Sequence, residues 1–170
     1  STYAIHMIEL MGSRLIRLPG DTSKLQILYN TYGDAKDDTL SYTASSEERY
    51  DRAVAFAAKV LGESDPLPSK INQASSELVA AWKKLAVSAS YVALDAEIAT
   101  SKAIIDVTGT DADRQKTYTV DSYKAFLEAY DAAVNVERDL SATEDNNRYI
   151  DGLKTDLENA RTGLEGAGSA

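Results

Sequence analysis

The sequence of 170 residues contains no cysteine, three prolines and nine glycines. The absence of cysteine excludes disulfides, thiolate nucleophiles and thiolate metal sites, and it leaves the redox compartment open. So few prolines and glycines are untypical of a turn-rich β-protein. Large apolar residues are scarce as well, with two phenylalanines and one tryptophan. An apolar content that relies on alanine favours helices packed closely side by side.

Basic residues are outnumbered, with 18 Lys and Arg against 27 Asp and Glu, for a formal net charge of -9. We therefore expect no nucleic-acid partner, because phosphate backbones are bound by clustered Lys and Arg. The same charge disfavours docking on anionic lipid. Long apolar runs are also missing: the most apolar stretch, 3–18, is interrupted by Arg14 and Arg17. It is neither a membrane span of roughly 18 residues nor a signal peptide by pattern.

The chain resembles itself when it is shifted along its own length. The motif Tyr-Thr-x-x-Ser occurs at 42–46 and again at 118–122, 76 positions later. Apolar residues downstream of it match at the same offset, in steps of three and four that place them on one face of a helix. The matched pairs are Tyr50 with Phe126, Ala53 with Ala129, Ala57 with Ala133 and Val60 with Val136. A match that keeps its helical phase over several turns predicts a duplicated unit.

Two further blocks repeat at slightly different offsets. The pattern Ile-x-x-Ala-x-x-x-Leu-x-x-Ala-x-x-x-Leu at 71–85 returns at 150–164, 79 positions later, with Leu in place of the first Ala. Upstream, Leu25 and Tyr29 correspond to residues 69 positions later, Leu94 and Ile98. The offset changes between blocks, where a connecting loop absorbs extra residues at little cost. Seven of these extra residues lie near 107–116.

Each copy predicts three helices. The fold class that we expect is all-α: two tandem antiparallel three-helix bundles that share a long connecting helix and form an elongated molecule. The expected helices are 24–37, 44–62 and 69–87 in the first copy, and 91–107, 120–140 and 145–165 in the second. The expected division of the chain is an N-terminal segment 1–23, a first module 24–88, a second module 89–166 and a tail 167–170.

The repeated motif carries the features of a helix start. Thr43 and Thr119 offer a hydroxyl to the unpaired amides of a first turn, with Ser46 and Ser122 as the third residue after each. The tyrosine before each threonine is placed to pack back on the helix as a hydrophobic staple.

Residues 69–108 contain neither glycine nor proline. The third helix of the first copy is therefore expected to continue into the first helix of the second. Such a helix of about 38 residues is about 57 Å long at the usual rise. The segment 88–90, Ser-Ala-Ser, is the place where a bend is most expected.

The Tyr-Thr-x-x-Ser element followed by the third-helix pattern resembles the FIVAR module ("found in various architectures"), over residues 25–86 and 94–165. The resemblance implies an accessory three-helix module of Gram-positive surface proteins and secreted glycoside hydrolases, close to catalytic domains, carbohydrate-binding domains and wall anchors. It implies no catalytic residue and no cofactor. Two departures are the insertion near 107–116 and residues 1–20, which are an added helix, the end of a preceding domain or a cloning remnant.

Catalytic constellations are weak. The only histidine, His6, lies in the segment without a counterpart, and no Gly-x-Ser-x-Gly elbow is present. The carboxylate pairs at 47 and 51 and at 128 and 131 have a spacing that suits glycoside hydrolysis only across a sugar-sized cleft. A narrow bundle fills its interior with its own side chains, so these pairs are interpreted as solvated helix faces.

Two loops are rich in aspartate, and crowded carboxylates are typical of Ca²⁺ sites. Neither loop has the spacing of an EF-hand, so a solvated loop and a calcium site both remain open and no metal ligand is assigned. The residues are Asp34, Asp37 and Asp38 in one loop and Asp106, Asp111 and Asp113 in the other.

Tyrosines are the most distinctive side chains, because sugars stack on exposed aromatic faces. Tyr50, Phe126 and Tyr130 follow the apolar stripes and are expected in the core, and Trp82 is expected to cover a core edge. A glycan or protein patch is the alternative use of the aromatic residues, and its candidate members are Tyr32, Trp82, Tyr91, Tyr123 and Tyr149.

The function that we expect is a non-catalytic, extracellular spacer that positions neighbouring domains of a cell-surface or secreted protein. It needs no cofactor, no nucleic acid and no membrane insertion, and it is expected to be a monomer. One alternative is an adhesin module that binds a glycan or a host protein. A second alternative is a subunit of a surface layer or coat.

Overall fold

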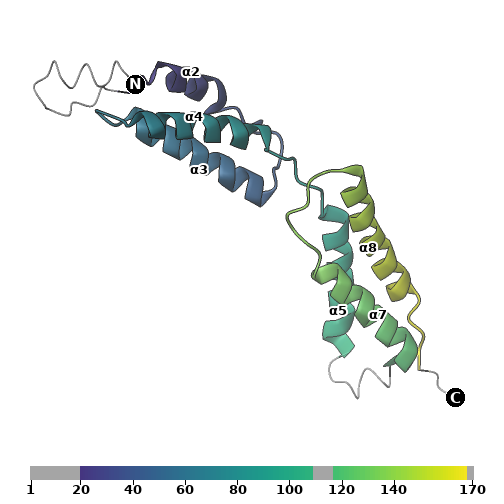
Figure 1. Ribbon diagram of the computed structural model, residues 1–170. Coiled ribbons are helices and arrows are strands. Elements are labelled where there is room, and N and C mark those ends of the chain that lie inside the picture. Colours follow the sequence, from purple (N-terminus) through teal and green to yellow (C-terminus); the bar gives the residue numbers. More distant parts are fainter. Residues whose placement is uncertain (1–19, 109–116, 168–170) are drawn as a thin grey trace, which may run out of the picture. The chain divides into compact units, whose positions relative to one another are not determined.

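The computed structural model describes residues 20–108 and 117–167, and these residues are all-helical, which confirms the predicted class. Within that part of the chain no helix is long and apolar enough to cross a membrane. The six described helices are α2 (Ser23–Tyr32), α3 (Ala44–Leu61), α4 (Pro68–Lys83), α5 (Val92–Thr108), α7 (Val120–Val134) and α8 (Glu144–Thr162) (Figure 1).

Contacts divide the chain into two compact units. Of the described residues, unit 1 comprises 20–39 and 46–85, and unit 2 comprises 40–45 and 86–167. The division between 85 and 86 lies close to the predicted module boundary. Residues 40–45 differ from the prediction, because they make their contacts with unit 2 although they precede most of α3 along the chain.

In unit 1, α2 lies beside α4, with α3 next to them (Figure 1). The core is built from one residue of α2 and the apolar stripes of α3 and α4. Because these stripes step by three and four, each helix turns one continuous apolar face inward. The buried members are Leu25, Tyr50, Ala53, Ala57, Val60, Ile71, Ala74, Leu78 and Ala81.

In unit 2, α8 packs against both α5 and α7. Its core has the same pattern with larger residues on α7, and tyrosines and leucines at its margin complete it. The buried members are Ala89, Leu94, Tyr123, Phe126, Ala133, Val136, Ile150 and Leu157.

The ends of the helices follow the sequence repeat. The second helix of each copy starts at equivalent positions, Ala44 and Val120, which are 76 apart. The third helix of each copy ends at equivalent positions, Lys83 and Thr162, which are 79 apart.

Backbone hydrogen bonds that close each copy also recur. In each copy, the residue before the second helix donates its N–H to a carbonyl of the segment that follows the third helix, which we call the closing segment. Two residues further along, the closing segment donates an N–H back to a carbonyl of the chain before the second helix. The first pair of bonds runs from Thr43 to Ala86 and from Ser88 to Ser41, both 2.8 Å; the second runs from Thr119 to Glu165, 3.0 Å, and from Ala167 to Thr117, 3.1 Å. Each bond of the second pair is the repeat equivalent of one in the first.

The predicted long helix over 69–108 is wrong. α4 ends at Lys83 and α5 begins at Val92, so residues 84–91 are not helical. On one side, their backbone groups bond to Ser41 and Thr43. On the other side, the Val87 carbonyl accepts from the Ala142 N–H, 2.8 Å, and the Ala89 N–H donates to the Leu140 carbonyl, 2.9 Å. Tertiary pairing therefore replaces the helical bonds even though no glycine or proline breaks the sequence.

The first helix also ends earlier than predicted, at Tyr32 and not at 37. The Tyr50 hydroxyl donates to the Tyr32 carbonyl and accepts from the Ala35 N–H, 3.0 Å. It occupies the carbonyl and amide groups at this helix end, so the chain turns away there. α7 likewise ends earlier than predicted, at Val134 and not at 140. Directly after this end, the Asn135 side chain donates back to the Asp131 carbonyl, 2.8 Å.

Candidate functional site

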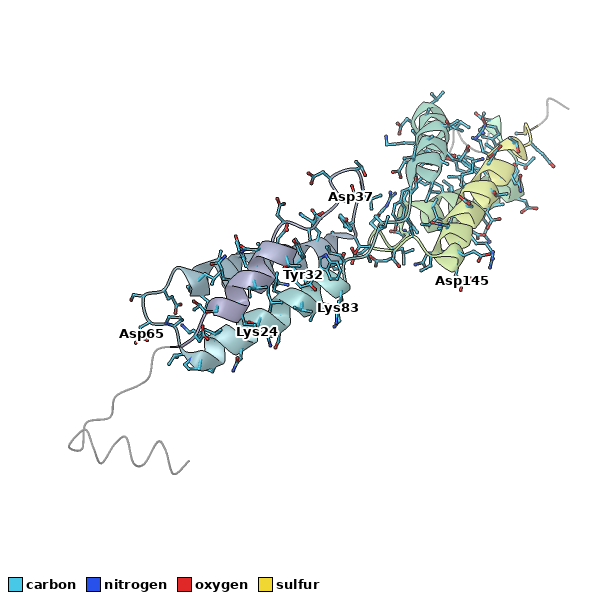
Figure 2. All side chains as sticks on the ribbon, turned by 90° about the horizontal axis from the view of Figure 1, so that it is seen from above. Lys24, Tyr32, Asp37, Asp65, Lys83 and Asp145 are labelled. Atoms are coloured by element: carbon cyan, nitrogen blue, oxygen red, sulfur yellow. The ribbon has the colours of Figure 1, made fainter. Side chains whose placement is uncertain are left out.

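Tyr32 and Trp82 of the predicted aromatic patch meet within unit 1. Their ring centroids are 4.8 Å apart at an interplanar angle of 44°, which joins the end of α2 to the end of α4. Trp82 keeps 37% of its surface exposed. Figure 2 shows Tyr32 on α2, over the helices of this unit. Tyr32 packs against the core of unit 1, whereas Trp82 contacts Tyr32 and is itself among the exposed large apolar residues, so the core-edge role expected for Trp82 stays a prediction.

Tyr91 stands at the start of α5 in unit 2 and holds the loop between α7 and α8. Its hydroxyl donates to the Glu137 carbonyl, 2.7 Å, and accepts from the Leu140 N–H, 3.3 Å. The guanidinium of Arg138 lies 4.9 Å from its ring centroid and pairs with Asp95, 2.8 Å. With both its hydroxyl and its ring in use, Tyr91 positions a loop and is a poor platform for a ligand.

Tyr123 does not belong to a surface patch, because only 7% of it is exposed. Its ring stacks on that of Tyr118 at 5.9 Å and tilts against that of Phe126 at 5.9 Å. Tyr118 precedes the N-cap of α7 and Tyr123 is the fourth helical residue, so the two tyrosines form the hydrophobic staple that the motif predicts at this helix. The inclusion of Tyr123 in an accessible patch was therefore wrong, because its ring packs between Tyr118 and Phe126.

Tyr149 is the most exposed of the five candidates, with 55% of its surface accessible on α8. No aromatic contact with another described side chain is present for it. The five aromatic residues therefore have different environments, and the structure brings only Tyr32 and Trp82 together.

Thr119 caps α7. Its hydroxyl accepts from the Ser122 N–H, 3.3 Å, and is 2.7 Å from the Ser122 hydroxyl, which in turn accepts from the Glu165 N–H, 3.2 Å. The cap is thus tied to the closing segment after α8. The equivalent residues before α3, Thr43 and Ser46, are both buried.

The first carboxylate pair is organised around a lysine. Lys36 lies 3.1 Å from Asp51 and 3.8 Å from Glu47, and the hydrogen bond to Asp51 raises the pKa of Lys36 above its ordinary value. Two carboxylates that share one ammonium group on a helix face are already neutralised in part.

The first aspartate loop is bonded locally. Asp37 accepts from the N–H and hydroxyl of Thr39, 2.9 and 2.6 Å, and these bonds lower the pKa of Asp37. Figure 2 shows Asp37 on the loop beyond the helices of unit 1. Of the second predicted loop, Asp106 lies within α5 and not in a loop, and it pairs with Lys102, 2.7 Å. Asp111, Asp113 and His6 lie outside the described residues. Within 20–108 and 117–167, no three His, Asp or Glu side chains are grouped for a metal ion.

A buried ion pair in unit 2 was missed at the level of sequence. Glu97 on α5 is 7% exposed and accepts from Arg161 on α8 through two nitrogens, at 2.5 and 3.3 Å. The buried Ser101 hydroxyl lies 3.4 Å from the same carboxylate. This carboxylate raises the pKa of Arg161. The repeat offsets place Glu97, Ser101 and Arg161 at the positions of Leu28, Tyr32 and Trp82, so a core location was readable from the alignment of the two copies.

Unit 1 has an open groove of about 520 Å³ between α3 and α4. Its lining combines four apolar side chains with three cations, one carboxylate and one amide, in a chain that is acidic overall. Arg52 lies 4.0 Å from Glu48, whereas no described side chain pairs with Arg49 or Lys84. The lining residues are Arg49, Arg52, Ala53, Phe56, Gln73, Glu77, Ala80, Ala81 and Lys84.

The sequence matches no protein-family profile, and neither a curated protein nor a solved structure is significantly similar to it. The resemblance to the FIVAR module therefore stays a prediction, and the function is argued from the contacts above.

Proposed function

We propose that the two units are tandem copies of one antiparallel three-helix module, and that the chain is a non-catalytic spacer which positions neighbouring domains of a cell-surface or secreted protein. The observation that carries this proposal is the recurrence of the closing hydrogen bonds, Thr43 to Ala86 and Thr119 to Glu165, at equivalent positions. The same positions also supply the two cores. The extracellular setting rests on the resemblance to the FIVAR module.

A spacer needs a connection that resists bending, and this role no longer falls to a long helix. It falls to the segment 84–91, of which residues 86–89 are bonded on two sides within unit 2, to 41–43 and to 140–142. Four backbone hydrogen bonds fix this segment, while a Gly-Ser linker of similar length behaves as a flexible coil.

Spin-label distance measurements test this proposal directly, because the chain has no cysteine. We would replace Lys24 and Asp145, exposed residues of different units, with cysteine and measure the width of the label-to-label distance distribution. A matched control is the pair Lys24→Cys and Lys83→Cys, which lies within unit 1. The proposal predicts a similar width for both pairs. A distribution between units several times broader than the control contradicts a stiff spacer.

A binding module is the second candidate function, and the groove between α3 and α4 favours it. Arg49 and Lys84 have no ion-pair partner in the described structure, and apolar side chains, Phe56 among them, share the groove with these cations. An acidic sugar or acidic peptide complements both features. Calorimetry with a hyaluronan tetrasaccharide, with neutral cellotetraose as the control ligand, tests it. Binding that is lost in the variant Arg49→Glu/Lys84→Glu supports the candidate; no binding, together with an empty plasma pull-down, removes it.

A further inference from the structure

The closing segment of the first copy is bonded on both of its sides. On one side Ser88 donates to Ser41, 2.8 Å, and on the other Val87 accepts from Ala142, 2.8 Å. Ser88 also pairs in antiparallel fashion with Ser141. All these residues belong to unit 2. The segment 86–89 is thus the middle of three extended pieces of chain.

Within 20–108 and 117–167, the closing segment of the second copy, 165–167, has backbone partners on one side only. The Ala167 N–H donates to the Thr117 carbonyl, 3.1 Å, as the Ser88 N–H donates to Ser41 in the first copy. Gly166 pairs with Tyr118, as Val87 pairs with Tyr42. The Gly166 carbonyl, which is equivalent to that of Val87, accepts no N–H from any residue that the structure describes. Residues 165–167 are all exposed. Unpaired edge backbone of this kind is a template for a further extended segment.

The loop that occupies the equivalent edge is shaped by its own helices. Tyr91 binds the loop backbone at Glu137 and Leu140, and Asn146 donates its side-chain N–H to the Ser141 carbonyl, 2.9 Å. These contacts come from α5 and α8, which follow the closing segment in the chain. A further module of this kind therefore presents its loop already formed, which lowers the entropy cost of docking.

A second copy of this chain does not supply such a loop. Its own Ala142 N–H is committed to Val87, and the loop after α3 has a different pattern of donors. There the N–H of Glu63 bonds back to the Val60 carbonyl, 3.2 Å, and Pro66 has no N–H. The occupant that fits is a separate module whose loop is not yet paired.

Charge narrows the occupant further. Next to the occupied edge, the carboxylate of Asp139 accepts from the Ser45 N–H, 3.1 Å, in the first turn of α3. The repeat places Asp121 of α7 at the position of Ser45. A loop that carried aspartate at the position of Asp139 would bring two carboxylates together, whereas a lysine or arginine there would meet an opposite charge.

We propose that the edge 165–167 is a docking site for the loop between the second and third helices of a further three-helix module, one with a basic residue where this chain has Asp139. The proposal rests on the repeat relationship advanced above. It makes the pair of units a segment that can be extended in one direction by the same junction.

The test replaces residues 168–170 of the chain with a second stretch of its own residues 89–167 that contains Asp139→Lys. The appended stretch is labelled with ¹⁵N separately from the resident one. Amide hydrogen exchange then compares the appended Ala142 with the resident Ala142. We expect protection of the two amides to agree within about threefold, since both donate to an equivalent carbonyl.

Two control chains isolate the contact. Retaining Asp139 in the appended stretch is expected to speed exchange of the appended Ala142 at least tenfold, and added salt is expected to narrow this difference. Ala142→Pro in the appended stretch removes the donor and is expected to leave the appended unit tumbling independently in ¹⁵N relaxation. Far-UV circular dichroism establishes that each appended unit is folded.

The outcomes separate the two proposals. A protected resident Ala142 with a fully exchanging appended Ala142 overturns the docking site and leaves the proposed module pair standing. An unprotected resident Ala142 removes the junction itself, and with it both proposals. Head-to-tail association of the unextended chain, detected by analytical ultracentrifugation, contradicts the choice of a separate module as occupant.

Discussion

Arg161 and Glu97 form a buried ion pair at the position where the sequence repeat places Trp82 and Leu28 in the other unit. In unit 1 the aromatic contact of Tyr32 with Trp82 joins α2 to α4, whereas in unit 2 a charged contact joins α5 to α8.

The ion pair gives the first prediction. Arg161→Ala leaves the carboxylate of Glu97 buried without its partner, and we expect a loss of about 3 kcal/mol in the free energy of unfolding of unit 2. The matched variant Glu97→Leu/Ser101→Tyr/Arg161→Trp transfers the residues of unit 1 and is expected to be neutral or stabilising, because it removes the desolvation cost. Urea denaturation followed by NMR signals of unit 2 measures both. A triple variant less stable than Arg161→Ala would contradict the equivalence of the two positions.

Tyr50 and Phe126 are equivalent, but only the first has a hydroxyl with partners. Tyr50→Phe removes the bonds to Tyr32 and Ala35, and we expect a loss of about 1–2 kcal/mol in unit 1. Phe126→Tyr, the reverse change, is expected to destabilise unit 2, because it buries a hydroxyl at a site with no exposure. Thermal unfolding of the two variants checks this. If either substitution stabilises its unit, the assigned role of the hydroxyl is wrong.

The junction is expected to depend on pH through Asp139. Hydrogen bonds from Ser45 lower the pKa of Asp139 in the folded chain. A group with a depressed folded pKa contributes stability above its unfolded pKa of about 4, and this contribution is lost as the pH falls through the folded value. The ¹H shift of the Ser45 amide, followed from pH 7 to pH 2, measures that value. We expect a midpoint below about 4 and no such transition in Asp139→Asn; a midpoint above 4 would contradict the contact.

The cap of α7 gives a further prediction. Thr119→Ala removes the acceptor for the Ser122 amide and is expected to cost about 1 kcal/mol. Thr143→Ala is the matched control at α8, where the threonine accepts from the Asn146 N–H, 3.1 Å. We expect Thr119→Ala to be the more costly of the two, because Ser122 also accepts from Glu165. Equal losses in chemical denaturation would mean that the link to the closing segment adds nothing.

Sequence periodicity predicted the helices and most of the core, because buried positions repeat every three or four residues and the repeat supplied two readings of each helix. The stripes of α3 and α4 in particular are buried as predicted. The end of α4 was not predicted, since its cause lies in hydrogen bonds to distant segments. The repeat nevertheless held a signal for it: Gly163, which follows α8, is equivalent to Lys84, which follows α4.

The candidate site was less predictable than the fold. Exposure of a tyrosine depends on what the neighbouring helices bring to it, and the motif alone does not separate Tyr123, which is buried, from Tyr149, which is exposed. The burial of Glu97 was not predicted for a similar reason. A carboxylate in a helix is usually solvated, and its partner Arg161 is 64 residues away in the chain. The groove with Arg49 and Lys84 joins residues from two helices, which no local pattern reports.

We have proposed that the two units are copies of one module and that the hydrogen-bonded segment between them makes the chain a stiff spacer. Backbone ¹⁵N relaxation of the intact chain tests it most directly, because helical amides of each unit report the tumbling of whatever they are rigidly joined to. If the spacer is stiff, the helical amides of unit 1 (α2, α3 and α4) and those of unit 2 (α5, α7 and α8) fit one rotational diffusion tensor. Two separate and shorter correlation times, one for each unit, would contradict it.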